Sequence, residues 1–164
     1  MTQDDGGAGR AEPLTDPSVE LVRAMLRVAP RLMRLEAQVL SELPTPLTHR
    51  QFRILARIGD GATSPTSISR RSNVSLAAIA ESIGVLVERG LIDRRPDVAD
   101  GRAHRLTLTA SGRRSWQAAE RAVVSICADV ATRLPPSVPT ASTHAVEQVR
   151  LAIDARSDPV TSED

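Results

Sequence analysis

The sequence lacks residues that several classes of protein require. Its 164 residues include no Tyr, one Phe, one Trp and one Cys, and every one of the 21 Lys or Arg positions holds Arg. A single cysteine excludes an intrachain disulfide and a cysteine metal cluster. No apolar run approaches the ~18 residues of a membrane span, so we expect a cytoplasmic protein with no membrane segment. A core so short of aromatics must consist of Leu, Ile, Val and Ala, which favours packed helices over a β sandwich.

Positive charge is concentrated in the middle of the chain. Residues 48–115 carry twelve Arg and six acidic residues, whereas residues 116–164 carry four Arg and seven acidic residues. The formal net charge of the whole chain is only +1. A basic centre between near-neutral or acidic flanks can attract a polyanion locally, and chance clustering of Arg is the alternative explanation.

The two ends and the long helices set the expected organisation. Residues 1–15 and 157–164 are polar and aperiodic, so we expect disordered tails around a single domain at 16–156. An apolar stripe predicts a helix from Asp16 to about residue 43, bent at Pro30, and another stripe predicts helices within 110–156. Cys127 lies on the second stripe and is expected to be a buried, inert thiol. These end helices expose more apolar face than one central module can cover, so 16–43 and 110–156 are predicted to dimerise.

The centre of the chain, residues 47–109, has the order of a winged helix-turn-helix motif. Thr48 and Gln51 form a capping box that begins a helix at His49 and ends at Gly59. A short helix after Ser64-Pro65, a turn at Asn73 and a helix over 76–89 follow. Alternating strands at 91–95 and 103–108, joined by a Pro-, Asp- and Gly-containing turn, predict a hairpin. The fold class is therefore mostly α with a small β hairpin wing.

In such a motif the second helix enters the major groove of DNA. The outward residues that can reach base edges are Ser75, Ala77, Ala78, Glu81, Ser82 and Val85. Arg102 lies at the tip of the wing, and an arginine there can enter a narrow minor groove. Arg94, Arg95 and Arg105 flank the tip, where they bind phosphates or remain solvated charges on a strand.

Three motifs, in this order and spacing, resemble those of the multiple antibiotic resistance regulator (MarR) family. They are Leu47-Thr48-x-x-Gln51-Phe52, Leu86-x-Glu88-Arg89-Gly90-Leu91-Ile92-x-Arg94, and Asp100-Gly101-Arg102 followed by Leu106-Thr107-Leu108-Thr109-x-x-Gly112-Arg113. The resemblance covers about residues 16–156. It implies a transcription regulator, commonly a repressor, that binds a pseudo-palindromic operator in double-stranded DNA as a homodimer. It also implies a small aromatic or phenolic effector in a pocket bordered by 22–40, 52–58 and 116–127.

One departure from the family pattern leaves a second hypothesis open. Ala80 and Glu81 stand where members commonly have Ser or Thr followed by Arg. A carboxylate repels phosphates, although Glu can accept a hydrogen bond from cytosine N4 and Ala can contact the thymine methyl group. The alternative is a winged-helix protein-interaction module with weak or lost DNA binding, and Glu81 and Glu88 favour it. No phosphate loop, paired catalytic carboxylates or activated nucleophile is present, so we expect no enzyme, no cofactor and no metal site.

Overall fold

The computed structural model describes residues 16–72, 74–96 and 104–157. Its elements are α1 (Pro17–Ser41), α2 (His49–Gly59), α3 (Pro65–Ser72), α4 (Leu76–Glu88), β1 (Ile92–Pro96), β2 (His104–Leu108), α5 (Ala110–Ala131) and α6 (Val138–Ser157). The fold is mostly α with one antiparallel two-stranded hairpin, which confirms the predicted class. The tail expected at 1–15 lies outside the described residues, as does 158–164, whereas Ser157 is the last residue of α6.

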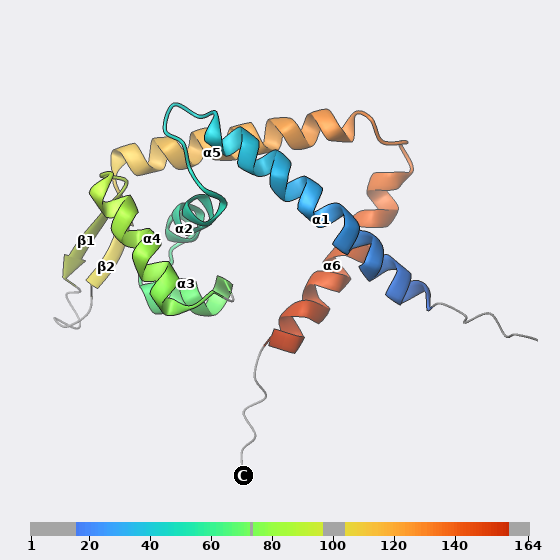
Figure 1. Cartoon of the computed structure of the whole chain (residues 1–164), viewed down its shortest axis with the longest axis horizontal. Helices are drawn as coiled ribbons and strands as arrows, with labels where there is room; N and C mark the ends of the chain where they lie inside the picture. Colours follow the sequence, from blue (N-terminus) through green and yellow to red (C-terminus); the bar gives the residue numbers. More distant parts are fainter. Residues whose placement is uncertain (1–15, 73, 97–103, 158–164) are drawn as a thin grey trace, which may run out of the picture.

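The small elements gather at one end of the long helices. Figure 1 shows α2, α3, α4 and the hairpin near the start of α5, with α6 following the far end of α5. The C-terminal half of α1 packs on α5, and both of these helices contact α2. The molecule thus consists of a winged module (α2, α3, α4, β1 and β2) and a helical arm (α1, α5 and α6).

The core is aliphatic, as the composition predicts. The largest fully buried side chains are Leu40, Ile54, Leu55, Ile68, Ile79, Ile83, Leu86, Leu91, Ile92 and Leu106. Phe52 is also buried, and Trp116 packs against the same cluster from α5. Because α2, α3, α4 and both strands contribute, one core fixes the back of α4 to the rest of the module.

The first turn of α2 has the capping box that its sequence predicts. The Gln51 backbone N–H donates to Thr48 Oγ1 (3.2 Å), and the Thr48 backbone N–H donates to Gln51 Oε1 (3.1 Å). Leu47 and Phe52, which flank this turn, are both buried. Two otherwise unpaired donors are satisfied, so α2 begins sharply at His49.

Thr48→Ala is expected to lower the free energy of unfolding by about 1 kcal/mol, because the Gln51 N–H loses its acceptor. Urea unfolding followed by circular dichroism measures the change. Thr48→Ser keeps the hydroxyl and should unfold close to the wild type. Equal midpoints for the alanine variant and the wild type would contradict the capping role.

Helix α1 starts where predicted and is not broken by proline. Asp16 Oδ1 accepts a hydrogen bond from the Ser18 N–H (2.8 Å), and Pro17 occupies the first helical position. The helix continues through Pro30 to Ser41, two residues short of the predicted end. Pro30 has no backbone N–H, so α1 lacks one hydrogen bond at this point, but the helix does not end there.

The hairpin follows α4 after a glycine with positive φ. Gly90 has φ +68°, a conformation that glycine adopts without steric cost at a helix end. The register pairs Ile92 with Leu108 and Arg95 with Arg105. The Leu106 N–H donates to the carbonyl of Thr63 (2.8 Å), which attaches β2 to the segment between α2 and α3.

The start of α5 is bonded to the end of α4. Thr109 Oγ1 donates to the Gly90 carbonyl (2.7 Å) and accepts from the Gly112 N–H (2.9 Å). The Thr109 N–H donates to the Leu91 carbonyl (3.1 Å). A Cβ at Gly112 would lie 1.9 Å from that carbonyl oxygen. The two segments are therefore in backbone contact, which we call the α4–α5 junction (Gly90, Leu91, Thr109 and Gly112).

Large apolar side chains remain exposed along the helical arm. They are Val19, Leu21, Val22, Leu26, Val28, Leu32 and Met33 of α1, Val124 of α5, Leu134 after it, and Val146, Leu151 and Ile153 of α6. Leu26 is 68% exposed.

Cys127 of α5 is also exposed. The expectation of a buried thiol is therefore wrong for the single chain, because this part of the apolar stripe of α5 lies beyond the core. Among the described helices, none has the length and apolar character to span a membrane.

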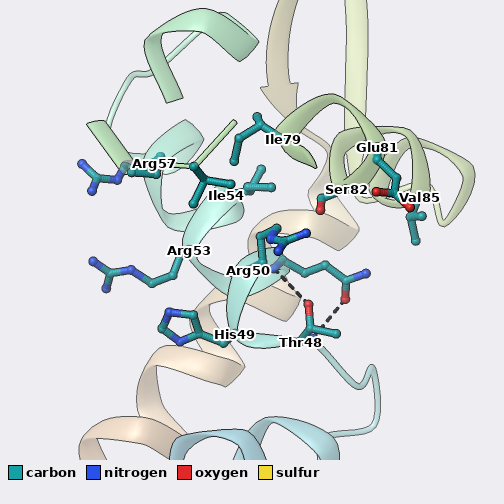
Figure 2. Close-up of a pocket in the computed structure, with 13 residues that line it drawn as sticks. Thr48, His49, Arg50, Arg53, Ile54, Arg57, Ile79, Glu81, Ser82 and Val85 are labelled. Atoms are coloured by element: carbon teal, nitrogen blue, oxygen red, sulfur yellow. Dashed lines mark hydrogen bonds between the residues drawn. The ribbon is translucent and has the colours of Figure 1, made fainter. Parts of the chain in front are cut away.

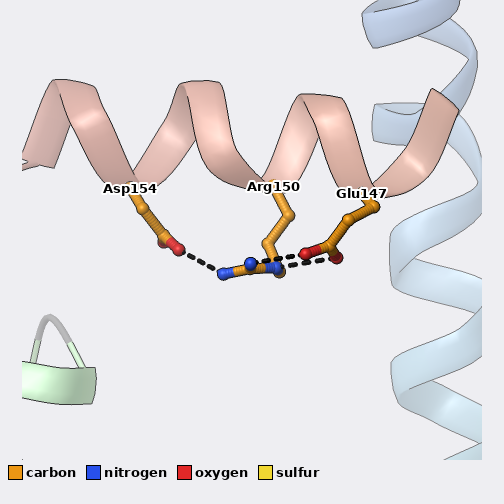
Figure 3. A network of polar contacts seen from close by, with 3 residues as sticks. All are labelled: Glu147, Arg150 and Asp154. Atoms are coloured by element: carbon orange, nitrogen blue, oxygen red, sulfur yellow. Dashed lines mark hydrogen bonds and ion pairs between the residues drawn. The ribbon is translucent and has the colours of Figure 1, made fainter. Parts of the chain in front are cut away.

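A polar network lies along the exposed surface of α6. Arg150 of α6 donates to both oxygens of Glu147 (2.9 and 2.5 Å) and to Asp154 (2.5 Å), as Figure 3 shows. The hydrogen bond from Arg150 lowers the pKa of Glu147. These pairs, three and four residues apart on a solvated helix, support α6 locally.

Candidate nucleic-acid interface

Helix α4 has one buried face and one exposed face. Ile79, Ile83 and Leu86 are buried, whereas the residues predicted to reach bases lie on the other side. Of these, Ser75, Ala77, Glu81 and Val85 are exposed, and Ala78 and Ser82 are half-buried. The structure thus brings all six predicted residues to one side of α4, while their contact with DNA stays a prediction.

Two serines on this face already have local hydrogen bonds. Ser75 Oγ accepts from the Ala78 N–H (3.3 Å) and caps α4, and Ser82 Oγ donates to the Ala78 carbonyl (2.9 Å). The Ser82 proton is used inside the helix, but its oxygen can still accept a hydrogen bond from a base. Ser82 is therefore best suited to a donor such as an exocyclic amine.

Helix α4 itself is acidic. Its only charged residues are Glu81 and Glu88, since Leu76–Glu88 contains no Arg. A helix with two negative charges cannot supply the attraction to phosphates that non-specific DNA affinity requires. The positive charge must come from neighbouring elements.

The hairpin supplies part of this charge. Arg95 and Arg105 are cross-strand partners on one face, and Arg95 Nη2 pairs with Asp93 Oδ2 (3.2 Å). Arg94 is opposite Leu106 in the register, so it lies on the other face. All three arginines are exposed. The three are therefore divided between the two faces of the hairpin, and Arg102, expected at the tip, lies outside the described residues.

A groove of about 810 Å³ separates α2 from α4, and we call it the α2–α4 groove. One wall is α2 from Thr48 to Arg57, and the other includes Ile79, Glu81, Ser82 and Val85 of α4. In Figure 2, Arg53 and Arg57 extend from α2 in the same direction, and Arg50 lies closer to α4. The predicted base-reading face is thus also one wall of a basic groove.

Arg50, Arg53 and Arg57 are not among the DNA-binding residues expected from the sequence, which placed residues 52–58 of α2 only at the border of an effector pocket. Their spacing of three and four residues places them on one side of α2, away from buried Leu55. This spacing is the signal that could have found them. His49, at the start of the same helix, is paired with Glu36 of α1 (Nδ1 to Oε2, 2.5 Å).

Arg89 connects the two walls of the groove, α4 and α2, by hydrogen bonds. Its guanidinium, just after α4, donates to the Pro46 carbonyl (2.7 Å) and to Gln51 Oε1 (3.2 Å). That same Gln51 oxygen accepts the capping hydrogen bond from Thr48. The end of α4 is therefore bonded directly to the start of α2.

The region predicted to border an effector contains Trp116. Its ring lies against Gly59, where an added Cβ would come within 2.7 Å of Cζ3. Trp116 therefore packs against α2, yet its Nε1 is buried with no hydrogen-bond partner among the described residues. A smaller cavity of about 210 Å³ lies between Leu43–Thr45 and the first turns of α5. Within the described ranges, no three His, Cys, Asp or Glu side chains gather to hold a metal ion.

Comparisons with known proteins agree with this geometry. The sequence profile of the MarR family matches residues 45–103, which span α2, α3, α4 and β1. A comparison with curated proteins finds no significant match. Many solved structures share the fold.

MarR of E. coli in its apo form is 24% identical, with 79% of this chain and 96% of that chain aligned at a TM-score of 0.69. CouR of Rhodococcus jostii, bound to p-coumaroyl-CoA, is 22% identical over 91% and 99% of the two chains, with a TM-score of 0.68. FabT of Streptococcus pneumoniae, in complex with DNA, is 16% identical over 83% and 96%, with a TM-score of 0.73. Residues 45–103 of this chain thus match the profile of the MarR family, and the chain as a whole shares the fold of these three proteins.

Proposed function

We propose that this chain is a sequence-specific DNA-binding repressor that acts as a homodimer on a pseudo-palindromic operator. The observation that carries the proposal is the exposed face of α4, which has the basic hairpin on one side and α2 on the other. The fold is shared with FabT, whose structure is a complex with DNA. A binding role of this kind requires no catalysis.

The proposed contacts follow from side-chain chemistry. Glu81 accepts from cytosine N4, and Ala77 and Ala78 contact thymine methyl groups. Ser75, Ser82 and Val85 complete the face in the major groove. Phosphates are bound by Arg94, Arg95 and Arg105, while Arg102 enters the minor groove.

The homodimer accounts for the apolar surface of the helical arm. Large apolar side chains of α1 and α6 are exposed, Leu26 and Ile153 among them. Each Å² of this apolar surface that a second copy covers stabilises the dimer by roughly 25 cal/mol. Sedimentation velocity at micromolar concentration should therefore show a dimer. A folded monomer at every concentration would remove the two-half-site operator from the proposal.

A fluorescence-anisotropy titration tests DNA binding. The purified protein is titrated with duplex from the intergenic region upstream of its own gene, with unrelated duplex as competitor, at two salt concentrations. We expect selective binding that weakens as salt rises, because counterions are released from the phosphates. A folded dimer with no preference for its own region would contradict this operator assignment.

The alternative function is a winged-helix module that docks a protein partner. The two carboxylates of α4, Glu81 and Glu88, favour it, since they oppose binding to a polyanion. Arg102→Ala separates the hypotheses. A DNA regulator should lose operator affinity when this arginine is removed, whereas a protein-docking module has no operator affinity to lose.

Glu81→Gln is expected to raise affinity for random-sequence duplex by roughly fivefold. Each dimer then loses two carboxylates near phosphates, worth about 0.5 kcal/mol apiece at a water-like dielectric. Anisotropy measures the change. Glu120→Gln, on α5, removes the same charge away from α4 and should leave affinity unchanged. A lower affinity of the Glu81 variant for random duplex would show that the carboxylate does not oppose binding.

Release by a small aromatic or phenolic ligand is the remaining part of the proposal. The buried, unpaired Nε1 of Trp116 supports it, because a ligand acceptor there would satisfy the indole N–H. CouR, of the same fold, is bound to p-coumaroyl-CoA. Trp116 is the single tryptophan of the chain, so a bound effector should change the intrinsic fluorescence. Phenolic acids that change it without releasing DNA would contradict effector control.

A further inference from the structure

We propose that the α2–α4 groove receives a sugar-phosphate strand of DNA and that Arg50, Arg53 and Arg57 bind its phosphates. This inference rests on the proposed DNA-binding function and adds a second phosphate-binding surface to it. The hairpin arginines would bind the backbone on one side of α4, and the α2 arginines would bind it on the other.

The first support is position. Glu81, Ser82 and Val85 belong both to the exposed face of α4 and to the wall of the groove. A helix lying in the major groove has a sugar-phosphate strand on each side, because the groove is bounded by the two backbones. In Figure 1 the hairpin lies on one side of α4 and α2 on the other. DNA that reaches this face of α4 must therefore run a backbone along the opening of the groove.

The second support is charge. Neither Arg50 nor Arg53 has an ion pair or side-chain hydrogen bond within the described part of the chain. His49, by contrast, is already paired with Glu36. Unpaired guanidinium groups beside an acidic recognition helix are available for phosphate oxygens, which they can bind through two parallel hydrogen bonds.

The third support is the length of the basic row. Arg50 and Arg57 are seven residues apart, which corresponds to about 10 Å along a helix axis. A DNA strand carries one charge per ~3.4 Å of axis, so a row of this length faces several phosphates. A single carboxylate of a small ligand would occupy only one of the three arginines. The spacing therefore favours a linear polyanion.

The test uses the full-length protein with Arg50→Ala and Arg53→Ala combined. Arg57 is left unchanged because it has a further interaction of its own. The control combines Arg133→Ala and Arg156→Ala, which remove the same charge from the segment after α5 and from α6. Circular dichroism and sedimentation establish that both variants are folded dimers. Anisotropy then gives the affinity for the intergenic duplex and for a random-sequence duplex at several salt concentrations.

We expect the groove variant to bind both duplexes more weakly by a similar factor, on the order of a hundredfold at physiological salt. A homodimer loses four arginines, so the slope of log affinity against log salt should fall by roughly 3 to 4. The control should keep the slope of the wild type.

Three outcomes overturn the inference, and they are distinguishable. If the wild type binds DNA and the groove variant keeps its affinity and slope, the groove holds no backbone and the proposed function stands. If the variant loses only the preference for the intergenic duplex, these arginines read sequence rather than phosphates. If the wild type binds neither duplex, the proposed function fails as well, and inorganic phosphate or a small aromatic carboxylate becomes the next probe of the groove.

Discussion

Gly112→Ala is expected to destabilise the fold by roughly 3 kcal/mol or more, because the added methyl group would overlap with backbone atoms. An ideal Cβ would lie 1.9 Å from the Leu91 carbonyl oxygen and 2.8 Å from its carbon. Both atoms belong to the backbone, so no side chain can rotate away. The first turn of α5 would have to move, breaking the hydrogen bonds of Thr109 to Gly90 and Gly112.

Urea unfolding of Gly112→Ala, followed by circular dichroism, measures this loss. Gly84→Ala is the matched control, because a Cβ at Gly84 in α4 meets nothing within 4 Å. Alanine is the better helix former, so the control should gain about 0.5–1 kcal/mol. If the two variants unfold at the same urea concentration, the close approach at the α4–α5 junction is not a constraint in solution.

Ile83→Ala and Val85→Ala are expected to have opposite consequences although they are two residues apart on α4. Ile83 is 0% exposed in the core, and its truncation should cost about 2–5 kcal/mol of stability. Val85 is 38% exposed on the face proposed to meet DNA, so its truncation should cost less than about 0.5 kcal/mol.

The pair of variants separates folding from binding. We expect Val85→Ala to change operator selectivity in the anisotropy assay while its thermal unfolding matches the wild type. Ile83→Ala should instead lower the unfolding temperature, with selectivity retained below the transition. A large loss of stability from Val85→Ala would mean that this side of α4 is covered, in the dimer, by the second copy rather than by DNA.

Much of the fold could be predicted because its signals are local. A capping box such as Thr48 and Gln51 predicts where a helix begins from four consecutive residues, without reference to the rest of the chain. The same holds for Ser75 before α4 and Thr109 before α5. The first strand was predicted one residue early, at 91–95 instead of Ile92–Pro96, since alternation cannot show that Leu91 belongs to the turn after Gly90.

The site was predicted less completely because it depends on how elements pack. The outward face of α4 follows from helical periodicity alone. The basic wall of the groove does not, since only the packing of α2 beside α4 gives Arg50 and Arg53 a place near that face. The pairing of Arg95 with Arg105 depends on the register of the hairpin, which the alternation of either strand alone does not give. The exposure of Cys127 likewise depends on where the core ends along α5.

The α4–α5 junction couples the orientation of α5 to the position of α4. Because Thr109 and Gly112 are in backbone contact with Gly90 and Leu91, the start of α5 cannot tilt without carrying the end of α4 with it. In the proposed homodimer the far parts of α5 would belong to the subunit interface. The angle between the two arms would then set the separation of the two α4 helices, which must match successive major grooves about 34 Å apart. A few degrees of rotation at the interface would thus change this separation enough that the two α4 helices no longer fit successive major grooves.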